Sequence, residues 1–320
     1  MTKPGSEPFS INLGRRIPIP NGRVALPRIG IGTGALGHLY TAVSDDQAEA
    51  TLEHAYDAGI RFFDTAPLYG AGLAERRLGR VLRSKRREEF VISTKVGRLV
   101  DAEGPTGSWH FDFSYDGIMR SLEESLKRLG LDRVDILHLH DPETNMDDAT
   151  DSGIRALRQL RDEGIIAAFG VGMNKAATLV RIAETTDIDC LLVANRFTLL
   201  DRTAEAVLLP LCARKEIAAI AGGVFNSGLL ASPAPGATFN YEPATADLIE
   251  RAGTLAEICK RHGAPLKAAA LQFPFRHPAV NAIVIGPRSV SELDDDLEQL
   301  RLAIPEDLWA AVDASDVLLR

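Results

Sequence analysis

The sequence predicts a closed (β/α)₈ barrel, in which eight parallel strands are surrounded by helices. Two observations lead to this prediction. Short apolar runs alternate with segments of helical periodicity along the 320 residues, and these runs are nearly continuously apolar, as parallel strands covered on both faces must be. Eight such units in one domain of this length are typical of the barrel. We expect a single domain over 1–320, with an N-terminal β-hairpin in 1–27 and an extra C-terminal helix in 301–320.

The expected strands follow one another at regular intervals. Asn21-Gly22 lies between two short β-prone runs and indicates the turn of the N-terminal hairpin. The barrel strands are expected at 28–32, 60–63, 90–97, 134–140, 165–172, 190–195, 217–224 and 281–286.

The intervening helices are indicated by apolar stripes and by residues typical of helix ends. Ser44 and Gln47 form a capping box, and Gly59 ends that helix. Asn174 is expected to cap the helix after the fifth strand, and Pro210 is expected to kink a helix over 203–215. Further helices are expected at 246–261, 265–273, from about 291 and at 308–317.

Bulk composition excludes several classes of function. The formal net charge is −8, which argues against a nucleic-acid surface. There is no apolar run long enough to span a membrane and no apolar core near the N-terminus, so we expect neither a membrane protein nor a signal peptide. Cys190, Cys212 and Cys259 are far apart, which indicates neither a disulfide framework nor a thiolate metal site. We therefore expect a cytoplasmic protein.

An open, doubly wound sheet is the alternative fold. Gly32, Gly34 and Gly37 superficially match the dinucleotide fingerprint GxGxxG. A lone match of this kind is weak evidence. The next helix also begins seven residues later, at Ser44, and no acidic residue is suitably placed for a ribose. The barrel is therefore preferred.

Four polar residues stand at or near the carboxyl ends of neighbouring strands. Asp64, Lys95 and His140 end the second, third and fourth expected strands, and Tyr69 lies in the loop after Asp64. Each of them alone is more simply explained as a cap, a packed ring or a solvated strand end. Strand ends of a barrel converge on the face that carries the chemistry. Together the four residues predict an acid/base site.

In FFDTAPLYG, STKVG and VDILHLHDP these residues resemble the catalytic Asp, Tyr, Lys and His of the aldo-keto reductase superfamily. The resemblance extends from about residue 28 to about residue 300. The segments AGGVFNSGLL, GVGMN and YDGIMRSLEESLKRLGLDRVDILHLHDPE are most similar to the branch of aldose 1-dehydrogenases and pyridoxal 4-dehydrogenases. The resemblance implies NAD or NADP as the cofactor and a small molecule as the substrate.

These residue types suit proton transfer. A free tyrosine has a pKa of about 10. Cationic Lys95 is expected to lower the pKa of Tyr69, and Asp64 to keep the lysine charged. Tyr69 could then act as general base on a hydroxyl or as general acid on a carbonyl, with His140 orienting the substrate oxygen. The hydride must come from or go to a nicotinamide, because no side chain carries one.

His138 and His140 point to the same face of one strand, which is also a spacing for metal ligands. A metallohydrolase would need further ligands at other strand ends. His262 and His277 fall outside the strand ends, so no metal site is predicted. His138 is expected to pack one layer below His140.

The resemblance also implies a cofactor groove. Phe197 is expected to stack on the nicotinamide. Gly172 and Met173 stand where Ser-Asn is usual, and Ala194 replaces a Gln, so Asn174 is the candidate for the carboxamide. A loop over 222–228 is expected to bind the pyrophosphate through backbone amides, and 285–296 to bind the adenosine. The remaining expected contacts are Thr33, Gly34, Gly223, Phe225, Asn226, Ser227, Gly228, Gly286, Arg288, Glu292 and Asp296.

The cofactor and the substrate are harder to predict. Arg288 is the one basic residue near Asp294, Asp295 and Asp296, which would repel a 2′-phosphate, so NAD is favoured over NADP. Trp109, in the loop 98–114, is expected to wall the substrate pocket or to pin that loop to the barrel.

The leading hypothesis for function is oxidation of the anomeric carbon of an aldose of the L-fucose, L-galactose or D-arabinose type to a lactone. Pyridoxal oxidation to a lactone, NADPH-dependent aldehyde reduction and a cofactor-sensing regulatory subunit are the alternatives. The oligomeric state is not indicated.

Overall fold

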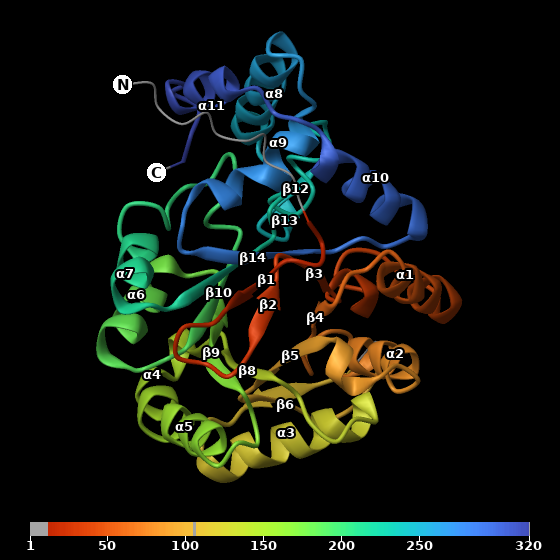
Figure 1. Ribbon diagram of the computed structural model, residues 1–320, viewed down its shortest axis with the longest axis vertical. Helices are drawn as coiled ribbons and strands as arrows, with labels where there is room; N and C mark the ends of the chain where they lie inside the picture. The colour runs from red at the N-terminus through yellow and green to blue at the C-terminus, as the bar shows by residue number, and fades with distance from the viewer. Residues whose placement is uncertain (1–11, 105–106, 320) are drawn as a thin grey trace.

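A closed barrel of eight parallel strands forms the centre of the computed structural model, which describes residues 12–104 and 107–319 (Figure 1). The strands are hydrogen-bonded around the barrel in the order β10-β11-β14-β3-β4-β5-β8-β9. Their bounds are β3 (Ile29–Gly32), β4 (Phe62–Asp64), β5 (Val91–Val96), β8 (Ile136–His140), β9 (Ala168–Met173), β10 (Cys190–Ala194), β11 (Ala218–Gly222) and β14 (Val280–Ile285). The (β/α)₈ prediction is confirmed.

The predicted N-terminal hairpin covers one end of the barrel; residues 1–11 of that segment lie outside the described residues. Strands β1 (Arg16–Pro18) and β2 (Ala25–Pro27) pair antiparallel. In the turn between them, the backbone N–H of Arg23 donates to the carbonyl of Ala167, just before β9, at 2.9 Å. Leu26 is fully buried in a small core cluster with residues of the barrel interior. The hairpin therefore closes the end at which the strands begin.

Helices surround the barrel, and their ends follow the expected capping chemistry. Ser44 Oγ accepts a hydrogen bond from the N–H of Gln47 at 3.2 Å, and Gly130 ends a helix with a left-handed φ of 63°. The helices are α1 (Asp45–Asp57), α2 (Leu73–Leu82), α3 (Tyr115–Leu129), α4 (Met146–Asp148), α5 (Ile154–Asp162), α6 (Ala176–Thr185), α7 (Leu208–Lys215), α8 (Ala246–Arg261), α9 (Leu266–Gln272), α10 (Val290–Arg301) and α11 (Glu306–Asp313). Short turns of 3₁₀- or π-helix lie at η1 (Ala35–Gly37), η2 (Arg87–Glu89), η3 (Pro142–Thr144), η4 (Ala149–Gly153) and η5 (Phe273–Arg276). Within 12–104 and 107–319, no helix is long and apolar enough to cross a membrane.

Three helix predictions need correction. The residue that precedes α6 is Lys175, without a side-chain cap, so Asn174 is not the cap. Pro210 does not kink α7, because the helix begins only at Leu208 and a proline is tolerated in the first turn. The last helix, α11, starts and ends earlier than expected; beyond it, Leu319 donates its N–H to the carbonyl of Leu200 at 2.8 Å.

Two short hairpins follow strands β5 and β11 and were not predicted. The first pairs β6 (Arg98–Val100) with β7 (Trp109–Phe111), and the second pairs β12 (Thr238–Phe239) with β13 (Glu242–Pro243). Both leave the barrel at the carboxyl ends of its strands, where the predicted site lies. They therefore bring residues from outside the barrel to the site.

Candidate active site

Asp64 and Lys95 form a buried ion pair across two neighbouring strands. Lys95 Nζ donates to Asp64 Oδ2 at 2.7 Å and to the carbonyl of Thr65 at 2.9 Å. Ser93 Oγ donates to the other carboxylate oxygen, Asp64 Oδ1, at 2.7 Å. The side chains of the pair are 3% and 2% exposed. Strands β4 and β5 are parallel neighbours, so both side chains lie at the same end of the barrel.

Tyr69 and His140 complete the set. The ring of Tyr69, from the loop after β4, has its centroid 4.8 Å from Lys95 Nζ. It also meets the His140 ring edge-on, with the centroids 6.0 Å apart. A Cβ at Gly37 would lie 2.7 Å from the backbone of Tyr69, so glycine is needed there for the loop to approach. The structure thus brings Asp64, Tyr69, Lys95 and His140 together.

Burial and charge set the protonation states of these groups. Burial by itself would lower the pKa of Lys95, but Asp64 and Tyr69 raise it by more, so the lysine stays charged. Burial raises the pKa of Tyr69, and Lys95 only partly opposes this rise. The expectation that Lys95 would bring the pKa of Tyr69 below its usual value is therefore wrong. Burial, with Lys95 and Arg98 nearby, holds the pKa of His140 well below its usual value, so its imidazole is neutral.

A cavity of about 260 Å³ opens beside these residues. Asp64 lies behind Lys95 and does not line it. The lining residues are Gly37, Leu39, Leu68, Tyr69, Gly70, Lys95, His140, Asp141, Gly172, Met173, Asn174, Leu192, Ala194 and Tyr241. Proton-transfer groups and a partly open space for a small molecule thus meet in one place.

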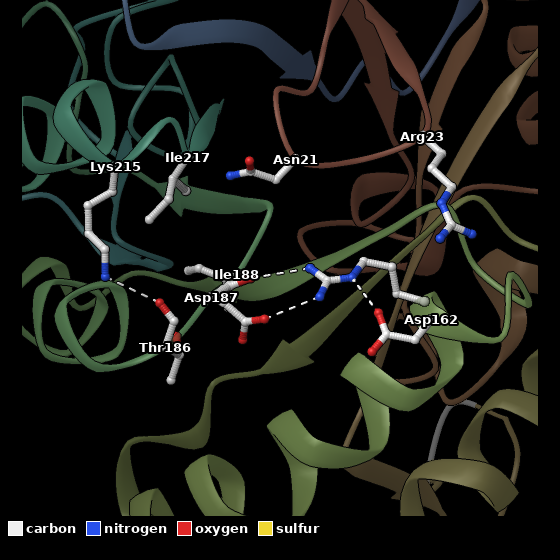
Figure 2. A pocket seen from close by; sticks show the side chains of 9 residues that line it. Asn21, Arg23, Asp162, Thr186, Asp187, Ile188, Lys215 and Ile217 are labelled. Atoms are coloured by element: carbon white, nitrogen blue, oxygen red, sulfur yellow. Dashed lines mark hydrogen bonds and ion pairs between the residues drawn. The ribbon is translucent and has the colours of Figure 1, made fainter.

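A second hollow, of about 590 Å³, is lined by Asp162, Asp187 and Ile217 among others (Figure 2). These residues precede β9, β10 and β11, so the hollow lies at the end of the barrel where the strands begin. Several of its polar groups bond one another: Lys215 Nζ donates to the carbonyl of Thr186 at 3.3 Å, and Asp187 pairs with Arg161 at 3.2 Å. Reactions in (β/α)₈ enzymes take place at the carboxyl ends of the strands. The smaller cavity is therefore the candidate active site.

His138 lies next to Lys95 in the strand register and is fully buried. Burial, with Lys95 nearby, lowers the pKa of His138 to about 3. Neither ring nitrogen has a hydrogen-bond partner in the described part of the chain. Among those same residues, no group of three or more His, Cys, Asp or Glu side chains could hold a metal ion.

Two expected ligand contacts lie outside the cavity. Phe197 is 2% exposed and packs against Phe273 and His277, with centroids 4.9 Å and 6.0 Å away. Its predicted position against the nicotinamide is not supported, because the ring is buried against Phe273 and does not line the cavity. Trp109 does not line the cavity and is 40% exposed. Asn174, by contrast, lines the cavity beside Ala194.

The loop after β11 has an unusual backbone. Gly223, Asn226, Ser227 and Gly228 have φ values of 62°, 47°, 60° and 106°. Within the described residues, the N–H groups of Val224, Phe225 and Ser227 donate no hydrogen bond. Successive free N–H groups on a left-handed backbone form an anion-binding concavity.

Two side chains of this loop maintain its shape. Asn226 is fully buried; its Oδ1 accepts from Thr198 Oγ1 at 2.6 Å, and its Nδ2 donates to the carbonyl of Asn195 at 3.1 Å. Ser227 Oγ accepts from the N–H of Tyr241 at 3.0 Å. Asn226 therefore supports the loop from within, while Ser227 ties it to the β12–β13 hairpin. Phe225 lies under a cation, Lys267 Nζ, which is 5.5 Å from its ring centroid.

The segment expected to bind adenosine is internally paired. Arg288 donates to Glu292 Oε1 at 2.5 Å. Asp296 is 3% exposed and lies 2.6 Å from Lys267 Nζ, which also contacts Asp295 at 2.5 Å. The expectation that Asp296 faces adenine is therefore wrong, because its carboxylate is enclosed. Lys267 is a second cation in this region that was not predicted.

The remaining predicted contacts lie near strand ends. Thr33 is fully buried and donates through Oγ1 to Thr65 Oγ1 at 2.8 Å, so it supports the end of β4. Gly34 is partly buried, and a Cβ there would lie 3.8 Å from the Tyr69 ring. Gly286 is exposed at the end of β14.

Several cavity residues were not predicted, and two of them, Asp141 and Tyr241, carry polar side chains. Tyr241 sits at the tip of the β12–β13 hairpin with a φ of 72°, and its ring stacks on that of Tyr40, with centroids 6.2 Å apart. Nothing in the local sequence predicts this, because the hairpin strands have only two residues each. Asp141 lines the cavity immediately after His140. Its place in HLHDP, directly after a strand end, could have indicated it.

An acid/base set of this kind at the carboxyl end of a (β/α)₈ barrel defines a class of oxidoreductases. The model of the Aldo/keto reductase family matches residues 28–317, and the chain belongs to that family. It is therefore an NAD(P)-dependent oxidoreductase.

Individual relatives are similar over most of their length. D-threo-aldose 1-dehydrogenase from Pseudomonas sp is 42% identical, over 90% of this chain and 93% of the relative. Pyridoxal 4-dehydrogenase from Microbacterium luteolum is 41% identical, over 89% and 92%. L-galactose dehydrogenase from Arabidopsis thaliana is 31% identical, over 84% and 82%.

Solved structures share the fold. The holo form of an aldo-keto reductase from Bacillus halodurans superimposes with a TM-score of 0.80 at 23% identity, covering 96% of this chain and 98% of that one.

Proposed function

We propose that this protein oxidises the anomeric carbon of an aldose to a lactone, with NAD or NADP as the hydride acceptor. The observation that carries the proposal is one cavity lined by Tyr69, Lys95 and His140, with Lys95 paired to buried Asp64 behind it. The similarity to D-threo-aldose 1-dehydrogenase and to L-galactose dehydrogenase supports a sugar as the substrate.

The four residues have distinct roles in this proposal. The C1–H of the cyclic sugar leaves as hydride, the C1–OH proton passes to Tyr69 Oη, and the C1–O bond becomes the lactone carbonyl. Lys95 stabilises the phenolate that accepts the proton, and Asp64 keeps Lys95 charged and in place. Neutral His140 donates a hydrogen bond to the reacting oxygen. The same groups in reverse order would reduce a carbonyl.

When the dinucleotide is bound, its nicotinamide serves as the hydride acceptor. The free N–H groups of Val224, Phe225 and Ser227 fit the oxygens of its pyrophosphate. Asn174 is at the cavity, where it would bond the carboxamide. We favour NAD over NADP, because Arg288 is already bonded to Glu292 and Lys267 to Asp295 and Asp296. A 2′-phosphate would have to compete with these carboxylates for both cations.

A matrix of cofactors and substrates tests the proposal. NAD and NADP are each combined with L-fucose, L-galactose, D-arabinose and pyridoxal, and reduced cofactor and lactone are measured together. We expect stoichiometric formation of both with at least one aldose. Oxidation of no aldose, together with NADPH-dependent reduction of simple aldehydes, would show that the protein is an aldehyde reductase instead. Cofactor binding without turnover of any compound would indicate a cofactor-sensing regulatory subunit.

Pyridoxal is the second candidate substrate. The relative that is 41% identical over 89% of this chain is a pyridoxal 4-dehydrogenase. The cyclic hemiacetal of pyridoxal would undergo the same conversion to a lactone at Tyr69. In the matrix, oxidation of pyridoxal with a kcat/KM above that of every aldose would establish this alternative.

A further inference from the structure

Asp141 occupies a strained backbone position at the edge of the active-site cavity. It follows β8 directly and has a φ of 46°, in the left-handed region that non-glycine residues rarely adopt. It lines the cavity together with Tyr69 and His140. Aspartate adopts this conformation more readily than most non-glycine residues, and here the conformation places Asp141 at the wall of the cavity.

The carboxylate of Asp141 is held from one side only. Arg98 Nη2 donates to Oδ2 at 2.7 Å, and the two side chains are 13% and 26% exposed. Within the described residues, Asp141 Oδ1 accepts no hydrogen bond. This oxygen is also not fully buried. Oδ1 is therefore available as an acceptor on a residue that lines the cavity.

The β6–β7 hairpin holds Arg98 in position. The Arg98 guanidinium lies 4.7 Å from the centroid of the Trp109 ring and 4.9 Å from that of Phe111. Trp109 and Phe111 also pack edge-on at 5.1 Å. Cation–π contacts restrict the direction of the guanidinium. Trp109 thus acts on the cavity through Arg98 and Asp141, although it does not line the cavity itself.

The distance to His140 indicates which part of a substrate Asp141 can reach. Asp141 Oδ2 lies 3.8 Å from His140 Nε2, and in the proposed function His140 bonds the reacting oxygen. A group that contacts Asp141 is therefore a near neighbour of the reacting carbon. A carboxylate accepts hydrogen bonds and donates none, so it selects a hydroxyl over an apolar or carbonyl group.

We propose that Asp141 determines specificity by accepting a hydrogen bond from the hydroxyl next to the anomeric carbon, and that Arg98 is its positioning residue. This inference rests on the proposed function, since it places the aldose at Tyr69 and His140. It narrows the substrate class to sugars with a free 2-hydroxyl.

The test compares aldoses with their 2-deoxy counterparts. For Asp141→Ala, kcat/KM for the 2-hydroxy sugar should fall about 10- to 100-fold, the range for a hydrogen bond to a charged group, whereas the value for the 2-deoxy sugar should change by less than about threefold. Arg98→Met should lower the ratio of kcat/KM for the 2-hydroxy sugar to kcat/KM for the 2-deoxy sugar. Arg98→Lys should retain part of this ratio.

Asp187→Asn is the matched control. Asp187, which is labelled in Figure 2, also holds an arginine, with Oδ1 2.5 Å from Arg158 Nη2. It precedes β10 and therefore lies at the end of the barrel opposite the active site. Its loss should leave the preference for the 2-hydroxyl unchanged. An equal fall of kcat/KM for both sugars in Asp141→Ala, or a wild-type enzyme indifferent to the 2-hydroxyl, would overturn this inference and leave the proposed function standing. A wild-type enzyme that oxidises no aldose would overturn both.

Discussion

Replacing Asp64 with asparagine should destabilise the protein strongly, because it leaves the Lys95 charge buried without its counterion. The two side chains are 3% and 2% exposed, and the ion pair is 2.7 Å long. At an effective dielectric constant of about 20, unit charges at this separation attract by about 6 kcal/mol. Removal of one partner from buried pairs typically costs about 3–5 kcal/mol. We expect a decrease of that size in the free energy of unfolding at neutral pH.

Urea unfolding, followed by circular dichroism, measures this decrease. Glu49→Gln is the control, because Glu49 Oε1 also lies 2.6 Å from an arginine, Arg80, but the two side chains are 33% and 41% exposed. Exposed pairs contribute about 0–1 kcal/mol. The double variant Asp64→Asn, Lys95→Met should be more stable than Asp64→Asn alone, because it removes the unpaired charge. If Asp64→Asn costs no more than Glu49→Gln, the ion pair is not what holds this end of the barrel together.

Two further predictions concern pH and the cofactor. Burial raises the pKa of Tyr69, so the phenol is protonated at neutral pH. The rate of carbonyl reduction should therefore be constant around neutral pH and fall only at alkaline pH. The rate of oxidation, which needs the phenolate, should rise with pH. A rate of oxidation that falls from neutral to alkaline pH would contradict this. Glu292→Gln releases Arg288 from a contact of 2.5 Å. Because charged hydrogen bonds contribute about 1.5–3 kcal/mol, we expect the ratio of Kd for NADP to Kd for NAD to fall about tenfold. Titration of both cofactors measures the ratio, and an unchanged value would show that Arg288 does not meet the 2′-phosphate.

The barrel and the four central residues could be predicted because each signal is local. An apolar run marks each strand, and Asp64, Lys95 and His140 are the polar residues at or near the ends of three such runs. The barrel then brings strand ends together regardless of what fills its outer layers. The place of Tyr69 near these strand ends could be predicted because the loop that leads to it from Asp64 is short.

Side-chain environments outside the barrel could not be predicted, because they depend on residues far away in the sequence. Phe197 is enclosed by Phe273, and Asp296 by Lys267. The pKa of Tyr69 depends on how completely the ring is buried. The hairpins that carry Trp109 and Tyr241 have strands of only two or three residues, too short for an alternating apolar pattern.

Steady-state oxidation by Tyr69→Phe, combined with titration of NAD, tests the central claim most directly. Phenylalanine keeps the ring that packs on His140 and Lys95 but removes the hydroxyl. If Tyr69 transfers the proton, kcat for the aldose should fall about 10²- to 10⁴-fold, while Kd for NAD stays within about twofold of the wild-type value. A variant that oxidises the sugar at the wild-type rate would show that another group carries the proton.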